Sequence, residues 1–239
     1  MDRFRDLLDS LTGIYESSCV DEFARQHLVS LAIHRVVEHP QAAADLLRAY
    51  MVHHFSNSCP RGNSHAHPNG FDKLSLYRSK LGFCVRLHVW RSDTRHVEQI
   101  HSHRWDFSSV VLCGALVAMN YRISRADEHG GERYYAVRLG DMQEHGKRAT
   151  NAGHVTLIHT NQARLGAMDS HSLRFSEPHR VRKEVVALTA TLVVTAPACS
   201  ANSISYRAEP MATAQVSCEP LGEAGFIDCV NILESALRN

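Results

Sequence analysis

The chain has 239 residues, of which 44% are apolar and 21% charged, a composition typical of globular proteins that excludes wholesale disorder. Its 26 Lys and Arg against 25 Asp and Glu leave a net charge of +1, which offers no electrostatic basis for binding nucleic acid. No stretch reaches the roughly 20 apolar residues of a membrane-spanning helix, and the charged amino terminus does not resemble a signal peptide. Seven scattered cysteines without a CxxC pair indicate neither a disulfide framework nor a zinc ribbon. We therefore expect a cytoplasmic protein that binds neither nucleic acid nor membranes.

The amino-terminal part of the chain predicts helices. Apolar residues recur three and four positions apart over residues 2–11 and 20–38, and Asp21 is a plausible helix start. Pro40 ends the second of these helices, and residues 41–53 predict a third. We expect the helices to pack on the outside of a sheet and to carry no chemistry.

The middle of the chain predicts strands. Residues 56–71 are rich in Pro, Gly, Asn and Ser and predict a loop, in which His65 and His67 are expected to be solvated or to form a weak adventitious metal site. After it, short apolar segments follow one another without helices between them, which favours an antiparallel barrel or sandwich. The expected strands cover residues 83–90, 108–124 with a turn at Gly114, 133–139, 154–160, 171–175 and 185–195, and a last helix covers residues 228–238.

The segment EQIHSHRWDFSSVVLCG, residues 98–114, contains the most informative pattern. Residues two apart in a strand project to the same side, so His101 and His103 are expected to point together into the barrel. Imidazoles that converge in this way are suited to a first-row transition metal. Trp105 shares their face, whereas Arg104 is expected to point away from it.

With Gly114 after the apolar run and His179 in a later HRV segment, the pattern resembles the cupins, and among them the cysteine dioxygenase type (thiol dioxygenases). The residues that carry the resemblance are Tyr77 and Arg78, Trp90, His101 and His103, His179 to Val181, and Ala196 with Pro197. They span about residues 77–197, half of the chain.

The resemblance implies an all-β fold, a cupin (double-stranded β-helix or jelly-roll) barrel with an N-terminal α-helical cap. We expect one cupin domain over residues 1–239. It would consist of a helical cap over residues 1–55, a barrel core over residues 74–197 and a carboxy-terminal extension with a helix over residues 198–239.

The resemblance also implies a function. His101, His103 and His179 would bind Fe(II), with His171 as the rival third ligand or as a partner that orients a ligand. Three neutral histidines leave coordination positions open for a substrate and for O2 as co-substrate. Arg78 corresponds to the arginine that binds the substrate carboxylate. We thus expect an Fe(II)-dependent dioxygenase-type enzyme that acts on a small carboxylate-bearing metabolite, amino acid or thiol-like.

The chain departs from thiol dioxygenases in two places. Their Ser-x-His-x-Tyr element is missing from the last strand, where Ala190, Leu192 and Val194 occupy the corresponding positions. Ser108 replaces the cysteine that some members crosslink to that tyrosine. The metal site therefore carries over better than the thiol chemistry, and cysteine itself is a poor candidate for the substrate.

Other functions stay open from the sequence. Zn, Ni or Mn could act as a Lewis acid in an isomerase, lyase or hydrolase, or the barrel could bind a ligand without turnover. Tyr121 or Tyr134 could supply the missing phenol, and exposed barrel edges favour a homodimer.

Overall fold

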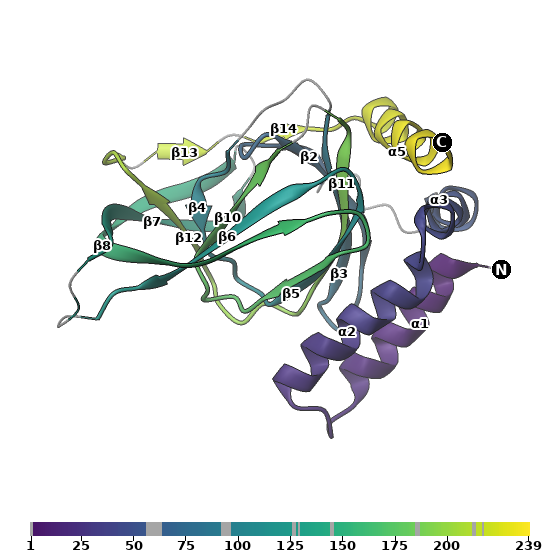
Figure 1. Ribbon diagram of the computed structural model, residues 1–239, viewed down its shortest axis with the longest axis horizontal. Helices are drawn as coiled ribbons and strands as arrows, with labels where there is room; N and C mark the ends of the chain where they lie inside the picture. The colour runs from purple at the N-terminus through teal and green to yellow at the C-terminus, as the bar shows by residue number, and fades with distance from the viewer. Residues whose placement is uncertain are drawn as a thin grey trace.

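A computed structural model describes residues 2–55, 64–91, 97–125, 128, 130–143, 146–184, 187–211, 214–216 and 218–239. Two antiparallel sheets face each other, and helices from both ends of the chain lie together beside one of them (Figure 1). No helix of the described residues is long and apolar enough to cross a membrane.

The predicted amino-terminal helices are confirmed. They are α1 (Arg3–Glu16), α2 (Glu22–Val37) and α3 (Pro40–Ala49), which continues as a π-helical turn over Tyr50–His54. The Asp21 carboxylate accepts a hydrogen bond from the Ala24 amide at 2.8 Å, as expected for an N-cap. Pro40 starts α3 at a position where its missing amide hydrogen costs nothing. The carboxy-terminal helix, α5 (Glu223–Arg238), begins five residues before the prediction.

The first sheet has the strand order β14-β1-β2-β3-β11-β5-β9. Its strands are β1 (His65–His67), β2 (Phe71–Arg78), β3 (Cys84–Trp90), β5 (Phe107–Cys113), β9 (Ser170–Leu173), β11 (Thr189–Thr195) and β14 (Glu219–Pro220).

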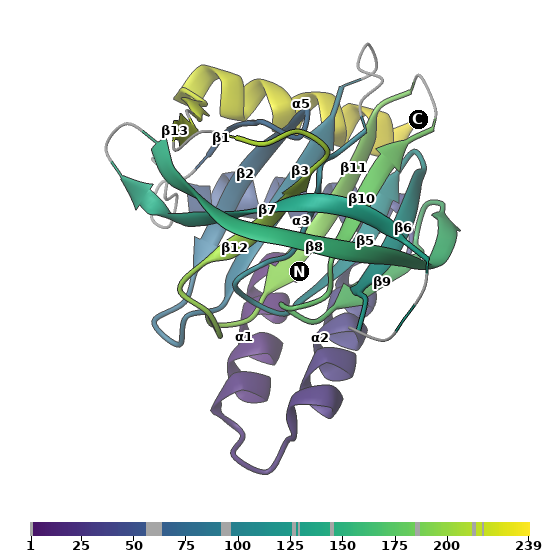
Figure 2. The same cartoon turned by 90° about the vertical axis from the view of Figure 1, so that its left-hand side faces the viewer.

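The second sheet has the order β13-β8-β6-β10-β4-β12-β7, and an additional pairing joins its last strand, β7, to its second strand, β8. Its strands are β4 (Ile100–His101), β6 (Leu116–Ile123), β7 (Glu132–Gln143), β8 (Gly146–Leu165), β10 (His179–Lys183), β12 (Ser203–Arg207) and β13 (Ala214–Val216). Figure 2 shows the long strands β7 and β8 crossing in front of the others.

Alternation in the first sheet separates the main core from the space between the sheets. In β3, Val85, Leu87 and Val89 belong to a large apolar cluster with buried residues of α1, α2, α3 and α5. Arg86 and His88 lie on the opposite face of the strand and line a cavity between the sheets. The helices therefore bury one face of the sheet and leave its other face free to form a site.

The predicted fold class, an all-β jelly-roll barrel of two antiparallel sheets with a helical cap, is confirmed by the strand pairings. The turn at Gly114 is also confirmed, with a φ of +76° between β5 and β6. The strands extend further than expected on both sides of residues 74–197. The predicted loop contains β1, where His65 is only 5% exposed, and β12 follows the barrel core. Residues 56–63 of that loop, and 185–186 of the predicted last strand, lie outside the described residues.

Candidate metal centre

A cavity of about 350 Å³ lies between the two sheets. Both sheets contribute to it: Arg86 and His88 come from β3 of the first, whereas His101 and His179 come from β4 and β10 of the second. The size suits a small-molecule ligand.

His101, His103 and His179 form one cluster, in which a ring nitrogen of each lies within 4.8 Å of the others. The Nε2 atoms of His103 and His179 are 3.3 Å apart. Two nitrogens at about 2.1 Å from a shared ion are separated by about 3.0–3.4 Å, so this spacing fits a common metal.

Hydrogen bonds to backbone carbonyls orient two of these rings. His101 Nδ1 lies 2.8 Å from the Gln99 carbonyl, and His179 Nδ1 lies 3.4 Å from the Glu177 carbonyl. Since a carbonyl oxygen only accepts, each Nδ1 carries the hydrogen and donates it. In a neutral imidazole the lone pair is then on Nε2, which is the arrangement of most metal-bound histidines.

Burial keeps the imidazoles neutral. Desolvation, reinforced by the neighbouring histidines, holds the pKa values of His103 and His179 well below the ordinary value. Neutral imidazole is the form that binds a metal, so His103 and His179 need no deprotonation at neutral pH. The donor set fits a first-row transition metal.

Different elements bring the three ligands together. His101 pairs directly with His179 across β4 and β10. His103 lies beyond the end of β4, where its amide donates a hydrogen bond to the Phe175 carbonyl at 3.0 Å. The expectation that His101 and His103 share one strand is thus wrong. The two rings nevertheless converge, because the hydrogen bond to Phe175 positions the loop that contains His103.

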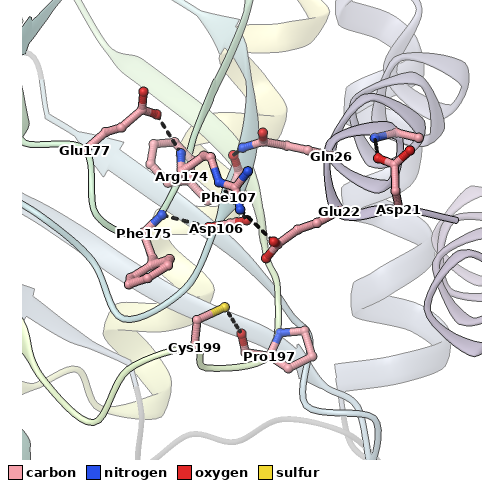
Figure 3. A network of polar contacts seen from close by, with 11 residues as sticks. Asp21, Glu22, Gln26, Asp106, Phe107, Arg174, Phe175, Glu177, Pro197 and Cys199 are labelled. Atoms are coloured by element: carbon pink, nitrogen blue, oxygen red, sulfur yellow. Dashed lines mark hydrogen bonds and ion pairs between the residues drawn. The ribbon is translucent and has the colours of Figure 1, made fainter.

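A polar network connects this loop to the helices (Figure 3). The Phe175 amide donates a hydrogen bond to the Asp106 carboxylate at 2.7 Å, and Arg174 forms an ion pair with Glu22 of α2 at 2.6 Å. Gln26 Nε2 donates to the Phe107 carbonyl at 3.1 Å. Asp106 therefore orders the segment that receives the His103 amide and that leads, four residues later, to His179.

His171 lines the same cavity, but it lies outside the cluster of three. It belongs to β9 of the first sheet, whereas His179 is in β10 of the second, so the two histidines reach the cavity from opposite sheets. Their ring centroids are 6.1 Å apart. His171 Nε2 is buried without a hydrogen-bond partner among the described residues, and burial lowers the pKa of this histidine to about 4.

The structure does not bring Arg78 to the histidines. It lies exposed at the end of β2 and does not line the cavity. Arg86, which the sequence analysis missed, is only 8% exposed and lies over the Trp105 ring, 4.5 Å from its centroid. The signal was present in FCVRLHVW, because placing Val85 and Leu87 against the core puts Arg86 on the other face.

The three residues of β11 that were compared with the Ser-x-His-x-Tyr element point away from the cavity. Ala190, Leu192 and Val194 face the helices in the main core. The residues of β11 that line the cavity are Thr191, Val193 and Thr195. The element is absent from both faces of this strand, and the hydroxyl of Thr195 is buried without a hydrogen-bond partner in the described part of the chain.

Of the other residues that the sequence analysis singled out, some line the cavity and others lie outside it. Trp105 lines the cavity as expected, and Arg104 does so as well, contrary to the expectation that it points away. His67 is half-buried and also lines the cavity, whereas His65 is only 5% exposed, so the expectation of solvation is wrong for His65. Tyr121 and Tyr134 pack in a separate apolar cluster, outside the cavity lining.

Ser108, at the position of the crosslinked cysteine, is 1% exposed. Its hydroxyl donates a hydrogen bond to the Gln26 carbonyl of α2 at 3.1 Å. In this chain the position therefore connects the barrel to the helices.

Comparison with known proteins gives only weak structural similarities. No family model matches the chain, and no curated protein sequence matches it significantly. The protein TT1209 from Thermus thermophilus is 20% identical, with a TM-score of 0.33 over 55% of this chain and 88% of that one. Oxalate oxidase in complex with glycolate is 10% identical, with a TM-score of 0.36 over 62% of this chain and 59% of that one. A cupin superfamily protein from Desulfitobacterium hafniense DCB-2 is 12% identical, with a TM-score of 0.31 over 55% and 82%. The fold assignment rests on the strand pairings above.

Proposed function

We propose that the protein is an Fe(II)-dependent oxygenase that acts with O2 on a small carboxylate-bearing metabolite. The observation that carries the proposal is the convergence of His101, His103 and His179 in a cavity that Arg86 also lines. Fe(II), when bound by such a set, supplies the redox chemistry that activates O2.

The environment of Arg86 supports the proposal that the substrate carries a carboxylate. Burial lowers its pKa, its guanidinium lies over the Trp105 ring, and no Asp or Glu of the described residues forms an ion pair with it. A buried guanidinium without a counter-ion is costly, and a substrate carboxylate that forms a bidentate pair with it removes the cost. Arg86 thus takes the role that the resemblance assigns to Arg78.

His171 is suited to proton transfer near the substrate. Its imidazole is neutral at neutral pH, and its Nε2 atom has no hydrogen-bond partner within the described ranges. A neutral imidazole at this position accepts a proton from a substrate donor, or holds the donor in place by a hydrogen bond.

Metal analysis and oxygen consumption test the proposal. Protein purified anaerobically without a histidine tag should contain near-stoichiometric iron, and His179→Ala should lose it. The iron-loaded protein should consume O2 in the presence of at least one compound from a panel of amino acids, thiols and aromatic acids. Arg86→Met, with Arg182→Met as the surface control, should raise KM for that compound.

Two outcomes overturn the proposal. Zinc or nickel in place of iron indicates a Lewis-acid isomerase, lyase or hydrolase. If the protein contains stoichiometric iron but consumes no O2 with any compound of the panel, the barrel binds its ligand without oxidising it.

A further inference from the structure

Another arginine, Arg207, lines the same cavity from the sheet opposite Arg86. It ends β12, and two further residues of this strand on the same face, Ser203 and Ser205, also line the cavity. The Nε atom of Arg207 is shielded from solvent and has no hydrogen-bond partner among the described residues. A donor of this kind lacks both water and protein acceptors, which is unfavourable unless a ligand supplies the acceptor.

Within the part of the chain that the structure describes, no carboxylate neutralises either of these two arginines. Among the described residues, no Asp or Glu forms an ion pair with Arg86 or Arg207. Glu98 is the one carboxylic acid in the described cavity lining. Its carboxylate accepts a hydrogen bond from the Val181 amide at 3.2 Å, and burial raises its pKa to about 8, so it contributes little negative charge at neutral pH.

The two guanidinium groups flank the histidines. Ser205 pairs with His101 across β12 and β4, so Arg207 lies two residues, about 7 Å, along the strand from that pair, on the side of Gln99. Arg86 lies on the other side, over Trp105, whose ring stacks near that of His103 with centroids 6.0 Å apart. The register and the ring contacts thus place Arg207 toward the Gln99 side of the histidines and Arg86 toward the Trp105 side.

We propose that the ligand of this cavity carries two anionic groups, and specifically that it is a small dicarboxylate held by Arg86 at one end and Arg207 at the other. The inference rests on the proposed function, which takes the cavity as the substrate site. It narrows the proposed substrate from any small carboxylate to a dicarboxylate. Charge-assisted pairs at both ends fix the orientation of the carbon chain beside the metal ligands.

A chain-length series tests the inference by calorimetry on the iron-loaded protein under anaerobic conditions. The probes are succinate, glutarate and adipate, each compared with its own monoamide, which keeps the length and removes one charge. The best dicarboxylate should bind roughly tenfold or more tightly than its monoamide. Arg207→Gln should abolish this preference while it leaves binding of the monoamide within about twofold.

Arg182→Gln is the matched control, since Arg182 is a half-exposed arginine of β10 whose side chain lies 3.8 Å from the Glu184 carboxylate and outside the cavity lining. It should preserve the preference. Equal binding of dicarboxylate and monoamide, a preference that survives Arg207→Gln, or binding of none of the three dicarboxylates overturns the inference. O2 consumption judges the oxygenase proposal separately, so each fails on its own measurement.

Discussion

His103 and His179 are 76 residues apart in the chain, yet their Nε2 atoms lie 3.3 Å apart. His103 follows β4 in a loop, and His179 begins β10. A metal that binds both residues therefore ties a loop to a strand, and its binding free energy adds to the stability of the fold.

Removal of one ligand is expected to remove the metal. His179→Ala and His103→Ala should each lower iron affinity by at least about 100-fold, because two imidazoles hold a first-row ion poorly. Equilibrium dialysis with iron analysis measures the affinity. His159→Ala, in an exposed part of β8, is the control and should retain the iron of the wild type. Full iron content in His179→Ala would show that the cluster of three is not the binding site.

Asp106 is expected to act on the metal through Phe175. Asp106→Ala leaves the Phe175 amide without its acceptor and frees the loop that positions His103, so iron affinity should fall by about tenfold. Asp106→Asn should restore most of the affinity, because its amide oxygen accepts the same hydrogen bond.

The control for Asp106 is Glu22→Gln, which breaks the surface ion pair with Arg174. Their side chains are 49% and 45% exposed, so the change should cost less than about 1 kcal/mol of stability and leave iron affinity unchanged. An equal loss of affinity in Asp106→Asn would contradict the hydrogen-bond argument and indicate that the charge matters.

The free energy of unfolding is expected to decrease as the pH falls below about 6.5, because His171 is buried in its neutral form. Its pKa is about 4 in the folded protein and about 6.5 when unfolded, so between these values the unfolded chain binds the extra proton. The contribution is fully present above about pH 6.5 and decreases as the pH falls toward 4, by about 1–3 kcal/mol.

Urea unfolding in the presence of a chelator at pH 7.5, 6 and 5 measures this loss. His171→Gln should lose correspondingly less stability over the same range. Parallel pH profiles of wild type and variant would refute the assignment.

Gly114 is expected to tolerate no side chain. Its φ is +76°, and a Cβ atom would lie 2.7 Å from the Leu188 carbonyl oxygen and closer still to Thr189. Gly114→Ala should cost roughly 2–4 kcal/mol from backbone strain and steric overlap. Gly13→Ala in α1 is the matched control, because apart from its chain neighbours and the backbone of its own helix no atom of the described residues lies within 4 Å of the new Cβ. It should raise stability by up to about 1 kcal/mol in the same urea titration.

The sequence by itself determined the local structure and part of the site. Periodicity and capping predicted α1 and α2, and the turn at Gly114 follows from the need for a residue that accepts a positive φ. The HxH spacing and the HRV segment singled out the histidines that converge. These signals depend on residues close together in the chain, so they can be recognised without knowledge of the tertiary contacts.

Tertiary structure decided which residues surround the histidines. The resemblance pointed to Arg78 and the sequence analysis missed Arg86, yet of these two arginines Arg86 lines the cavity, because the helices cover the opposite face of β3 and Arg78 lies at the exposed end of β2. Likewise, alternation shows that β11 has two faces but does not identify the one that turns inward, so Thr195 rather than Val194 lines the cavity. The choice of face depends on which layer covers the sheet, and that is a property of packing between distant segments.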